Sequence, residues 1–256
     1  MGTLAVEDDA WQLGIIKPTA CLITDVEVRA DNGALDTEIA ALVRTLRHSP
    51  ETILGRREVV GFDELFARMG YGAEVVPAGK HRVQLFQRRG FPRHNNLIDA
   101  YNIATAEFGA SLSLHDASKL QHADLHVFRA RGDESIRPMF KHNRVAIPPR
   151  DVVSATDAHG TEVLASVGRW DVDSEDFKVT DSSASVLLVV LGNAATSDAY
   201  NRAICDRVLE LIRRTCPSAN AEFLQVDHRA SLVTHGWLAG SAKPTRVPAA
   251  AVAVDR

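Results

Sequence analysis

Residue types suited to chemistry gather around one short apolar helix within residues 90–120. Asp99 and Asn102 lie three positions apart and so share a face of that helix, and His115 and Asp116 follow it. Histidine exchanges a proton near neutral pH, and a carboxylate can hold a cation. The cluster therefore marks a candidate site. Each residue alone also fits a structural role: Asp99 and Asn102 as satisfied polar groups, and His115–Asp116 as the cap of the next helical turn.

The helix that carries Asp99 and Asn102 is predicted over residues 96–108. Asn95 precedes it, and a short side-chain oxygen there can accept from backbone N–H groups that lack an intrahelical partner. Gly109 is suited to the position that ends a helix. A buried apolar stripe recurs at three- and four-residue spacing. Its members are Leu97, Tyr101, Ala104 and Phe108.

The rest of the chain predicts an α+β fold, with helices flanking a mixed or antiparallel central sheet, because helical patterns dominate the first half and strand patterns the second. The apolar run Val186–Leu191 predicts a strand buried on both faces. Helices are predicted over residues 37–48, 62–69, 80–89 and 199–215, and strands over residues 19–29, 124–131, 151–155, 162–167, 186–191 and 222–226.

No linker is visible in the 256 residues, so we expect one compact domain over residues 18–240. Residues 1–17 show no clear period and are predicted to form a loose N-terminal arm. Residues 241–256 are mainly Ala, Pro and Val, which predicts a mobile C-terminal tail.

The composition, 45% hydrophobic and 24% charged, is that of a globular protein that can bury a core without disulfides or metals. Its three cysteines are too few and too far apart for a zinc ribbon or a disulfide framework, and they indicate a reducing, cytoplasmic setting. No stretch approaches the ~20 apolar residues that cross a bilayer, so we expect no membrane partner. The net charge of −4 argues against general nucleic-acid coating but allows a local basic patch.

Motifs for common cofactors and nucleophiles are absent from the sequence. There is no GxxxxGK[ST] phosphate loop, no GxGxxG after a strand and no GxSxG nucleophile turn. His122 and His126 are four residues apart, but the second lies in a predicted strand, so the two would not face one metal ion. We therefore expect neither a metal nor a cofactor.

Basic side chains are concentrated just before the candidate site. Such side chains around a polar pocket could hold phosphates, which position a nucleic acid without reading its sequence. Basic pairs are also common on solvated surfaces. The candidate RNA-binding residues are Lys80, Arg82, Arg88, Arg89 and Arg93.

Two segments of the candidate site resemble a known family. Residues 93–102, RHNNLIDAYN, and residues 109–120 resemble the two motif segments of the B3/B4 domain, which is the editing domain of the phenylalanyl-tRNA synthetase beta subunit. The chain looks closer still to the freestanding B3/B4-domain proteins of bacteria. The resemblance covers about residues 62–226, where the weaker matches follow the family's order of helices and strands.

The resemblance implies a central mixed sheet with flanking helices and hydrolysis, in trans, of the ester on a mischarged aminoacyl-tRNA. The expected partner is thus the aminoacylated 3′ end of a tRNA, and nothing resembles the modules of a ligase. Asn102 stands at the family's editing-pocket asparagine, and Tyr101 at the neighbouring position. The family's histidine falls at Ser113, with His115 two residues later, and residues 183–190 offer no glutamate at the family's position. These departures suggest another amino acid than tyrosine, or binding without hydrolysis.

A mechanism follows from the resemblance and the residue types. An aminoacyl ester is reactive enough for a positioned water to attack it, so no serine or cysteine nucleophile is needed. Asn102 could orient the ester carbonyl or the water, and His115 is the candidate general base. Asp99 or Asp116 could bind the substrate's α-ammonium group.

A second wall of the pocket is expected from Arg169, Trp170 and Asp171. Trp170 could stack on the terminal adenine, although the residue type favours a core position over stacking. Two other functions stay open: a tRNA- or RNA-binding module without catalysis, and a binder of amino-acid-like small molecules. Salt-dependent tRNA binding without turnover would favour the first, and binding of free amino acids alone would favour the second.

Overall fold

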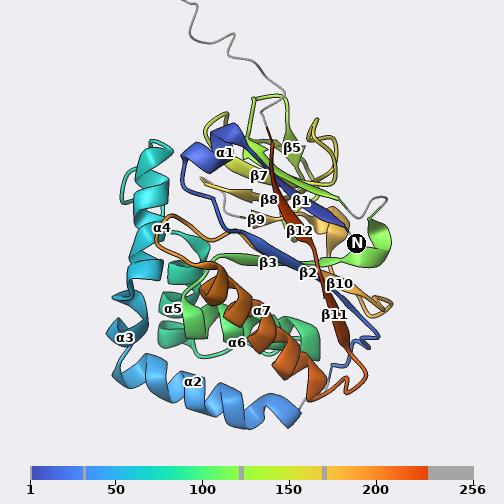
Figure 1. Ribbon diagram of the computed structural model, residues 1–256. Coiled ribbons are helices and arrows are strands. Elements are labelled where there is room, and N and C mark those ends of the chain that lie inside the picture. The colour runs from blue at the N-terminus through green and yellow to red at the C-terminus, as the bar shows by residue number, and fades with distance from the viewer. Residues whose placement is uncertain (1, 31–32, 121–123, 169–171, 230–256) are drawn as a thin grey trace, which may run out of the picture.

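A computed structural model describes residues 2–30, 33–120, 124–168 and 172–229 of the chain. These residues form three layers, in which a four-stranded sheet lies between a group of helices and a six-stranded sheet (Figure 1). The predicted α+β class is confirmed.

The outer sheet is mixed. Its strand order is β12-β1-β4-β7-β8-β9, and β1 pairs in parallel with both neighbours while the other pairs are antiparallel. The antiparallel β7–β8 pair joins the strands predicted over residues 151–155 and 162–167. The strands are β1 (Thr3–Glu7), β4 (Leu125–Arg129), β7 (Val152–Ala155), β8 (Val163–Val167), β9 (Val172–Asp173) and β12 (Gln225–Arg229).

The middle sheet is antiparallel throughout, in the order β11-β2-β10-β3. The predicted apolar strand becomes β10, which lies between two neighbours and is buried along its whole length. The strands are β2 (Thr19–Thr24), β3 (Leu112–Asp116), β10 (Val186–Val190) and β11 (Asn220–Phe223).

The main helices cover the outer face of the middle sheet, while α4 packs beside the core between the two sheets (Figure 1). The helices are α1 (Asp8–Gln12), α2 (Asp36–His48), α3 (Glu51–Leu54), α4 (Arg57–Arg68), α5 (Ala78–Arg89), α6 (Asn96–Phe108) and α7 (Asp198–Arg213). Three single turns, η1 (Gly33–Leu35), η2 (Ala117–Lys119) and η3 (Glu175–Phe177), and a small sheet of β5 (Ser135–Ile136) and β6 (Val145–Ala146) complete the described fold.

Helix α6 has the predicted bounds and the predicted ends. The Asn95 side chain accepts a hydrogen bond from the Ile98 N–H at 2.9 Å, and Gly109 ends the helix at φ +61°. The helix packs against α5 and α7 and is buried over most of its length. This burial explains why polar residues of α6 must find partners inside the protein or face a cavity.

The two faces of the middle sheet contact different cores, because side chains alternate along a strand. Val186, Leu188 and Val190 of β10 pack against the helices. Leu187 and Val189 pack against the six-stranded sheet. We call these the helix-side face and the inter-sheet face of the middle sheet.

The N-terminal segment differs from its prediction. Thr3–Glu7 is not a loose arm but strand β1, which pairs with β4 and β12 inside the outer sheet. Its partners lie more than 100 residues away in the sequence, so five residues without a clear local period gave no signal of it. The tail predicted over residues 241–256 lies outside the described residues.

Candidate functional site

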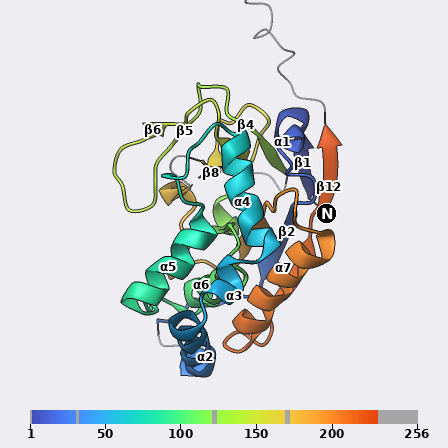
Figure 2. The same cartoon turned by 90° about the vertical axis from the view of Figure 1, so that its left-hand side faces the viewer.

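A cavity of about 440 Å³ lies on the helix-side face of the middle sheet. Helices α5 and α6 and strand β3 form its inner walls, and a loop before β6 and the segment after β9 form its mouth. Figure 2 shows the loop that carries β5 and β6 extending on the same side of the molecule as α5. The lining residues are Ala78, Arg82, His94, Asn95, Ile98, Tyr101, Asn102, Leu112, Leu114, Met139, Phe140, Val172, Asp173, Lys178 and Val179.

Asn102 is the polar residue buried deepest at this cavity, with only 1% of its surface exposed. Its side-chain oxygen has no hydrogen-bond partner among the described residues. A buried amide oxygen without a partner is uncommon and destabilising, since it has lost its hydration and gained nothing. A ligand or water in the cavity would supply the missing partner.

Tyr101 also borders the cavity, and it fixes the wall beside Asn102. Its hydroxyl donates to the Leu112 carbonyl at 2.7 Å, which ties α6 to the start of β3. Leu112, Leu114 and Ile98 supply apolar surface on either side. The interior is thus an apolar chamber with one unpartnered amide, an arrangement typical of a small-ligand site.

Charged residues border this chamber. Arg82 lies one turn along α5 from Ala78, and Lys178 forms an ion pair with Glu175 at 2.6 Å. Asp173, an acidic residue, is also part of the lining. The site therefore combines cations that suit phosphate with an anion that suits an ammonium group.

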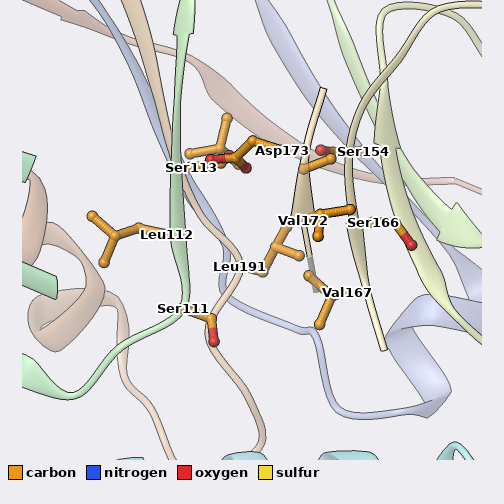
Figure 3. A pocket seen from close by; sticks show the side chains of 11 residues that line it. Ser111, Leu112, Ser113, Ser154, Ser166, Val167, Val172, Asp173 and Leu191 are labelled. Carbon is orange, nitrogen blue, oxygen red and sulfur yellow. The ribbon is translucent and has the colours of Figure 1, made fainter. Parts of the chain in front are cut away.

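A second, much smaller cavity of about 20 Å³ lies between the two sheets (Figure 3). Serines from both sheets line it, among them Ser111, Ser113, Ser154 and Ser166. Its volume is about that of one or two water molecules. The two cavities share the lining residues Leu112, Val172 and Asp173.

His115 does not belong to the large cavity, which corrects its assignment as general base. In β3 it faces Leu187 on the inter-sheet face, whereas Leu112 and Leu114 face the helices. It is fully buried, and both ring nitrogens lack a partner among the described residues. Burial lowers its pKa to about 3, so the ring stays neutral and is a weak base at neutral pH.

Ser113 shares the inter-sheet face with His115, since it pairs with Val189, and it lines the small cavity instead of the large one. Residues 112–116 form the strand β3, where the sequence predicted none. Once residues 112–116 are extended, alternation places Ser113 and His115 on the side of the sheet opposite Asn102.

Asp99 and Asp116 have structural partners, which corrects their assignment as ammonium ligands. The Asp99 carboxylate is fully buried and accepts from the Arg93 Nε and the His94 N–H, each at 2.9 Å. It therefore fixes the turn before α6.

Asp116 caps η2 by accepting from the Ser118 N–H at 3.1 Å, and it also accepts from the Ser183 hydroxyl at 2.7 Å. Burial alone would raise its pKa, but the hydrogen bonds from Ser118 and Ser183 outweigh burial and lower it. This carboxylate thus serves the structural role that the sequence analysis kept as an alternative.

The five candidate RNA-binding residues divide into two groups. Lys80 forms an ion pair with Asp63 at 2.9 Å, and Arg93 pairs with Asp36 and Asp99. Arg82, Arg88 and Arg89 form no ion pair with any described residue, and the last two are exposed. Arg89 lies seven residues, about 10 Å, beyond Arg82 on the same face of α5.

Arg169, Trp170 and Asp171 lie outside the described residues. The next residues, Val172 and Asp173, line both cavities. The sequence analysis missed Asp173, Met139, Phe140 and Lys178 as cavity residues. Met139 and Phe140 lie in residues 132–149, an irregular and basic segment whose sequence does not indicate where it packs.

No cluster of three or more metal-binding side chains occurs among the described residues. The cysteines Cys21, Cys205 and Cys216 are buried and free. Within the described ranges, no helix is long and apolar enough to cross a membrane.

Comparison with known proteins identifies the family. The model of the B3/4 domain matches residues 63–215, more than half of the chain, and this range contains α5, α6, β3 and the whole large cavity. No curated protein matches significantly. The solved structures similar to the chain include an N-terminal fragment of the phenylalanyl-tRNA synthetase beta-subunit from Pyrococcus horikoshii, at a TM-score of 0.46 and 11% identity. That match covers 89% of this chain and 52% of the fragment, so this chain spans about half of the fragment's length. The family match establishes that the chain belongs to the B3/4 domain family.

Proposed function

We propose that this protein hydrolyses the ester of a mischarged aminoacyl-tRNA in trans, with the cavity around Asn102 as the reaction site. The observation that carries the proposal is the buried Asn102 oxygen without a partner, at the wall of a cavity of about 440 Å³. Membership of the B3/4 family supports it, because the resemblance to the synthetase domain places its editing-pocket asparagine at Asn102.

In the proposed reaction, the oxygen of a water molecule attacks the carbonyl carbon of the ester. The bond from that carbon to the ribose oxygen breaks, the ribose oxygen takes a proton, and a free amino acid and an uncharged tRNA leave. Asn102 can accept a hydrogen bond from the water through its side-chain oxygen or donate one to the ester carbonyl through its amide. Either contact orients the water and the ester relative to each other, so the reaction needs no nucleophilic side chain.

Asp173 takes the role of ammonium ligand in this proposal, in place of Asp99 and Asp116. It is a lining residue of the cavity, which Asp99 and Asp116 are not. An aminoacyl group carries a positive charge next to the ester, and a carboxylate in a partly dry site would attract it.

The tRNA would lie along the basic face of α5. Arg82 at the cavity, and Arg88 and Arg89 further along the helix, form no ion pair with described residues. Phosphate contacts of this kind position a nucleic acid and make its binding depend on salt. We also infer a cytoplasmic location, in keeping with the three free cysteines.

Binding without hydrolysis is the second candidate function. One observation favours it: Asn102 and His115, the two residues predicted to be catalytic, lie on opposite sides of the middle sheet. A protein of this kind would bind an aminoacyl-tRNA and protect or deliver it.

A panel of mischarged tRNAs tests the proposal. The wild type should release the amino acid from at least one of them, and Asn102→Ala should slow this release about 100-fold, the effect of removing one catalytic hydrogen-bonding group. Asn102→Asp separates the two roles, since it keeps the acceptor and loses the donor. Binding of tRNA without release across the whole panel would favour the second candidate.

A further inference from the structure

Phe140 stands out at the mouth of the large cavity because its side chain is 77% exposed. Among the described residues, the other exposed large apolar side chains are Val60 on α4 and Val226 on β12. Phe140 lies on a different part of the chain from both, in the loop between β5 and β6. A lone exposed ring at a binding site suits a small flat ligand better than a protein surface.

The backbone holds Phe140 in a conformation that is rare for a bulky residue. Its φ is +63°, in the left-handed region that favours glycine. The residue is third in a turn closed by a hydrogen bond from the Lys141 N–H to the Pro138 carbonyl at 2.9 Å. Glycine is the usual residue at such a position, so the turn conformation does not explain the presence of a phenylalanine.

Contacts with the opposite wall of the mouth keep this turn in place. The Phe140 N–H donates to the Glu175 carboxylate at 2.8 Å, and the Met139 N–H donates to the Asp173 carbonyl at 3.0 Å. Glu175 also pairs with Lys178, whose amine lies 5.5 Å from the centre of the Phe140 ring. The ring is thus presented on a fixed backbone beside a cation.

We propose that Phe140 is the stacking platform for the terminal base of a tRNA 3′ end, with Lys178 and Lys141 near its phosphates. The inference rests on the proposed function. The ester is carried by the ribose of the terminal nucleotide, so a base whose ribose ester enters the cavity lies at the cavity mouth. Bases of single strands stack on exposed aromatic side chains, and nearby cations bind the backbone. Lys141 is exposed and forms no ion pair with a described residue.

An uncharged CCA trinucleotide with 2-aminopurine as its terminal base tests the stacking directly, because stacking quenches 2-aminopurine fluorescence. The wild type should quench the signal in a saturable manner. Phe140→Gly removes the ring and suits the positive φ, so the turn is retained, and it should weaken binding about tenfold. Phe140→Trp should restore the quenching. Val226→Ala, an exposed apolar residue away from the cavity, is the control and should behave as wild type.

Equal affinity and quenching in wild type and Phe140→Gly would overturn the inference, and so would no quenching by the wild type. The outcome is separate from hydrolysis, because the probe carries no ester. Quenching by a wild type that releases no amino acid would support the platform and contradict the hydrolytic function. Release of the amino acid by Phe140→Gly at an unchanged KM would support the hydrolytic function and contradict the platform.

Discussion

Both faces of the middle sheet bury polar groups that lack partners among the described residues, but the cavities beside these groups differ greatly in volume. On the helix side, the unpartnered oxygen of Asn102 meets a space of about 440 Å³. On the inter-sheet side, His115 is sealed in the core and Ser111 meets a space of about 20 Å³. An unsatisfied polar group is therefore a sign of function only where a ligand can reach it.

The comparison also shows how one strand separates residues that are close in sequence. Leu112 and Leu114 form a wall of the large cavity, while Ser113 and His115 between them face the other sheet. A difference of one position in β3 decides whether a side chain can touch the proposed substrate.

The largest expected effect that tests this comparison is a dependence of stability on pH. His115 has a pKa of about 3 when folded and an ordinary pKa near 6.5 when unfolded, so the unfolded state binds the proton first as the pH falls. The folded state therefore loses stability below about pH 6.5, by about 3 kcal/mol at pH 4. Urea unfolding at pH 7 and pH 4 measures the drop in the free energy of unfolding between the two pH values. Wild type and Asn102→Leu should show the same drop. In His115→Leu the drop should be smaller by about 3 kcal/mol. The same loss in all three proteins would contradict a buried neutral histidine.

Asp116→Ala should lower the free energy of unfolding by about 2 kcal/mol, because it leaves the buried Ser183 hydroxyl and the η2 N–H without their acceptor. Asp116 follows Leu114 on the helix-side face but does not line the cavity. The rate of ester hydrolysis should therefore stay at the wild-type value. A raised KM with unchanged stability would return Asp116 to the substrate site.

Arg82→Gln should weaken tRNA binding a fewfold and reduce the slope of log affinity against log salt by about 0.7 to 0.9, the share of one phosphate contact. Lys80→Gln on the same helix is the matched control, because Lys80 is already paired with Asp63. Binding titrations at several salt concentrations measure both. A larger change in slope for Lys80→Gln than for Arg82→Gln would contradict the proposed position of the nucleic acid at the cavity mouth.

Ser111→Ala should have the smallest effect. The Ser111 hydroxyl is buried without a partner among the described residues, so its removal should change the free energy of unfolding by less than about 1 kcal/mol. Hydrolysis should change less than twofold. A strong loss of activity with unchanged stability would show that the substrate reaches the small inter-sheet cavity.

The sequence predicted the elements whose formation depends on residues close together in the chain. Helix α6 was predicted to the residue, since Asn95, the apolar stripe and Gly109 each act within a few residues of one another. The strand β10 was predicted from its unbroken apolar run. Strand β1 was missed because only distant pairing stabilises it.

The candidate site was predicted in part. Asn102 was singled out by its residue type and spacing, the family resemblance placed it and Tyr101 at the editing pocket, and both line the large cavity. His115 was assigned to the pocket because no strand was predicted over residues 112–116, although Leu112 and Leu114 alternate with Ser113 and His115 there. Phe140 and Lys178 come from loops, whose packing no periodicity encodes.

The most direct test of the account compares two buried polar residues on opposite faces of the sheet, Asn102→Leu and His115→Leu, in single-turnover deacylation with parallel measurements of Tm. We expect Asn102→Leu to lose about 100-fold in rate while its Tm is unchanged or higher, because it removes an oxygen that has no partner among the described residues. His115→Leu should keep its rate within twofold. A wild-type rate in Asn102→Leu, or a loss of activity confined to a folded His115→Leu, would contradict the account.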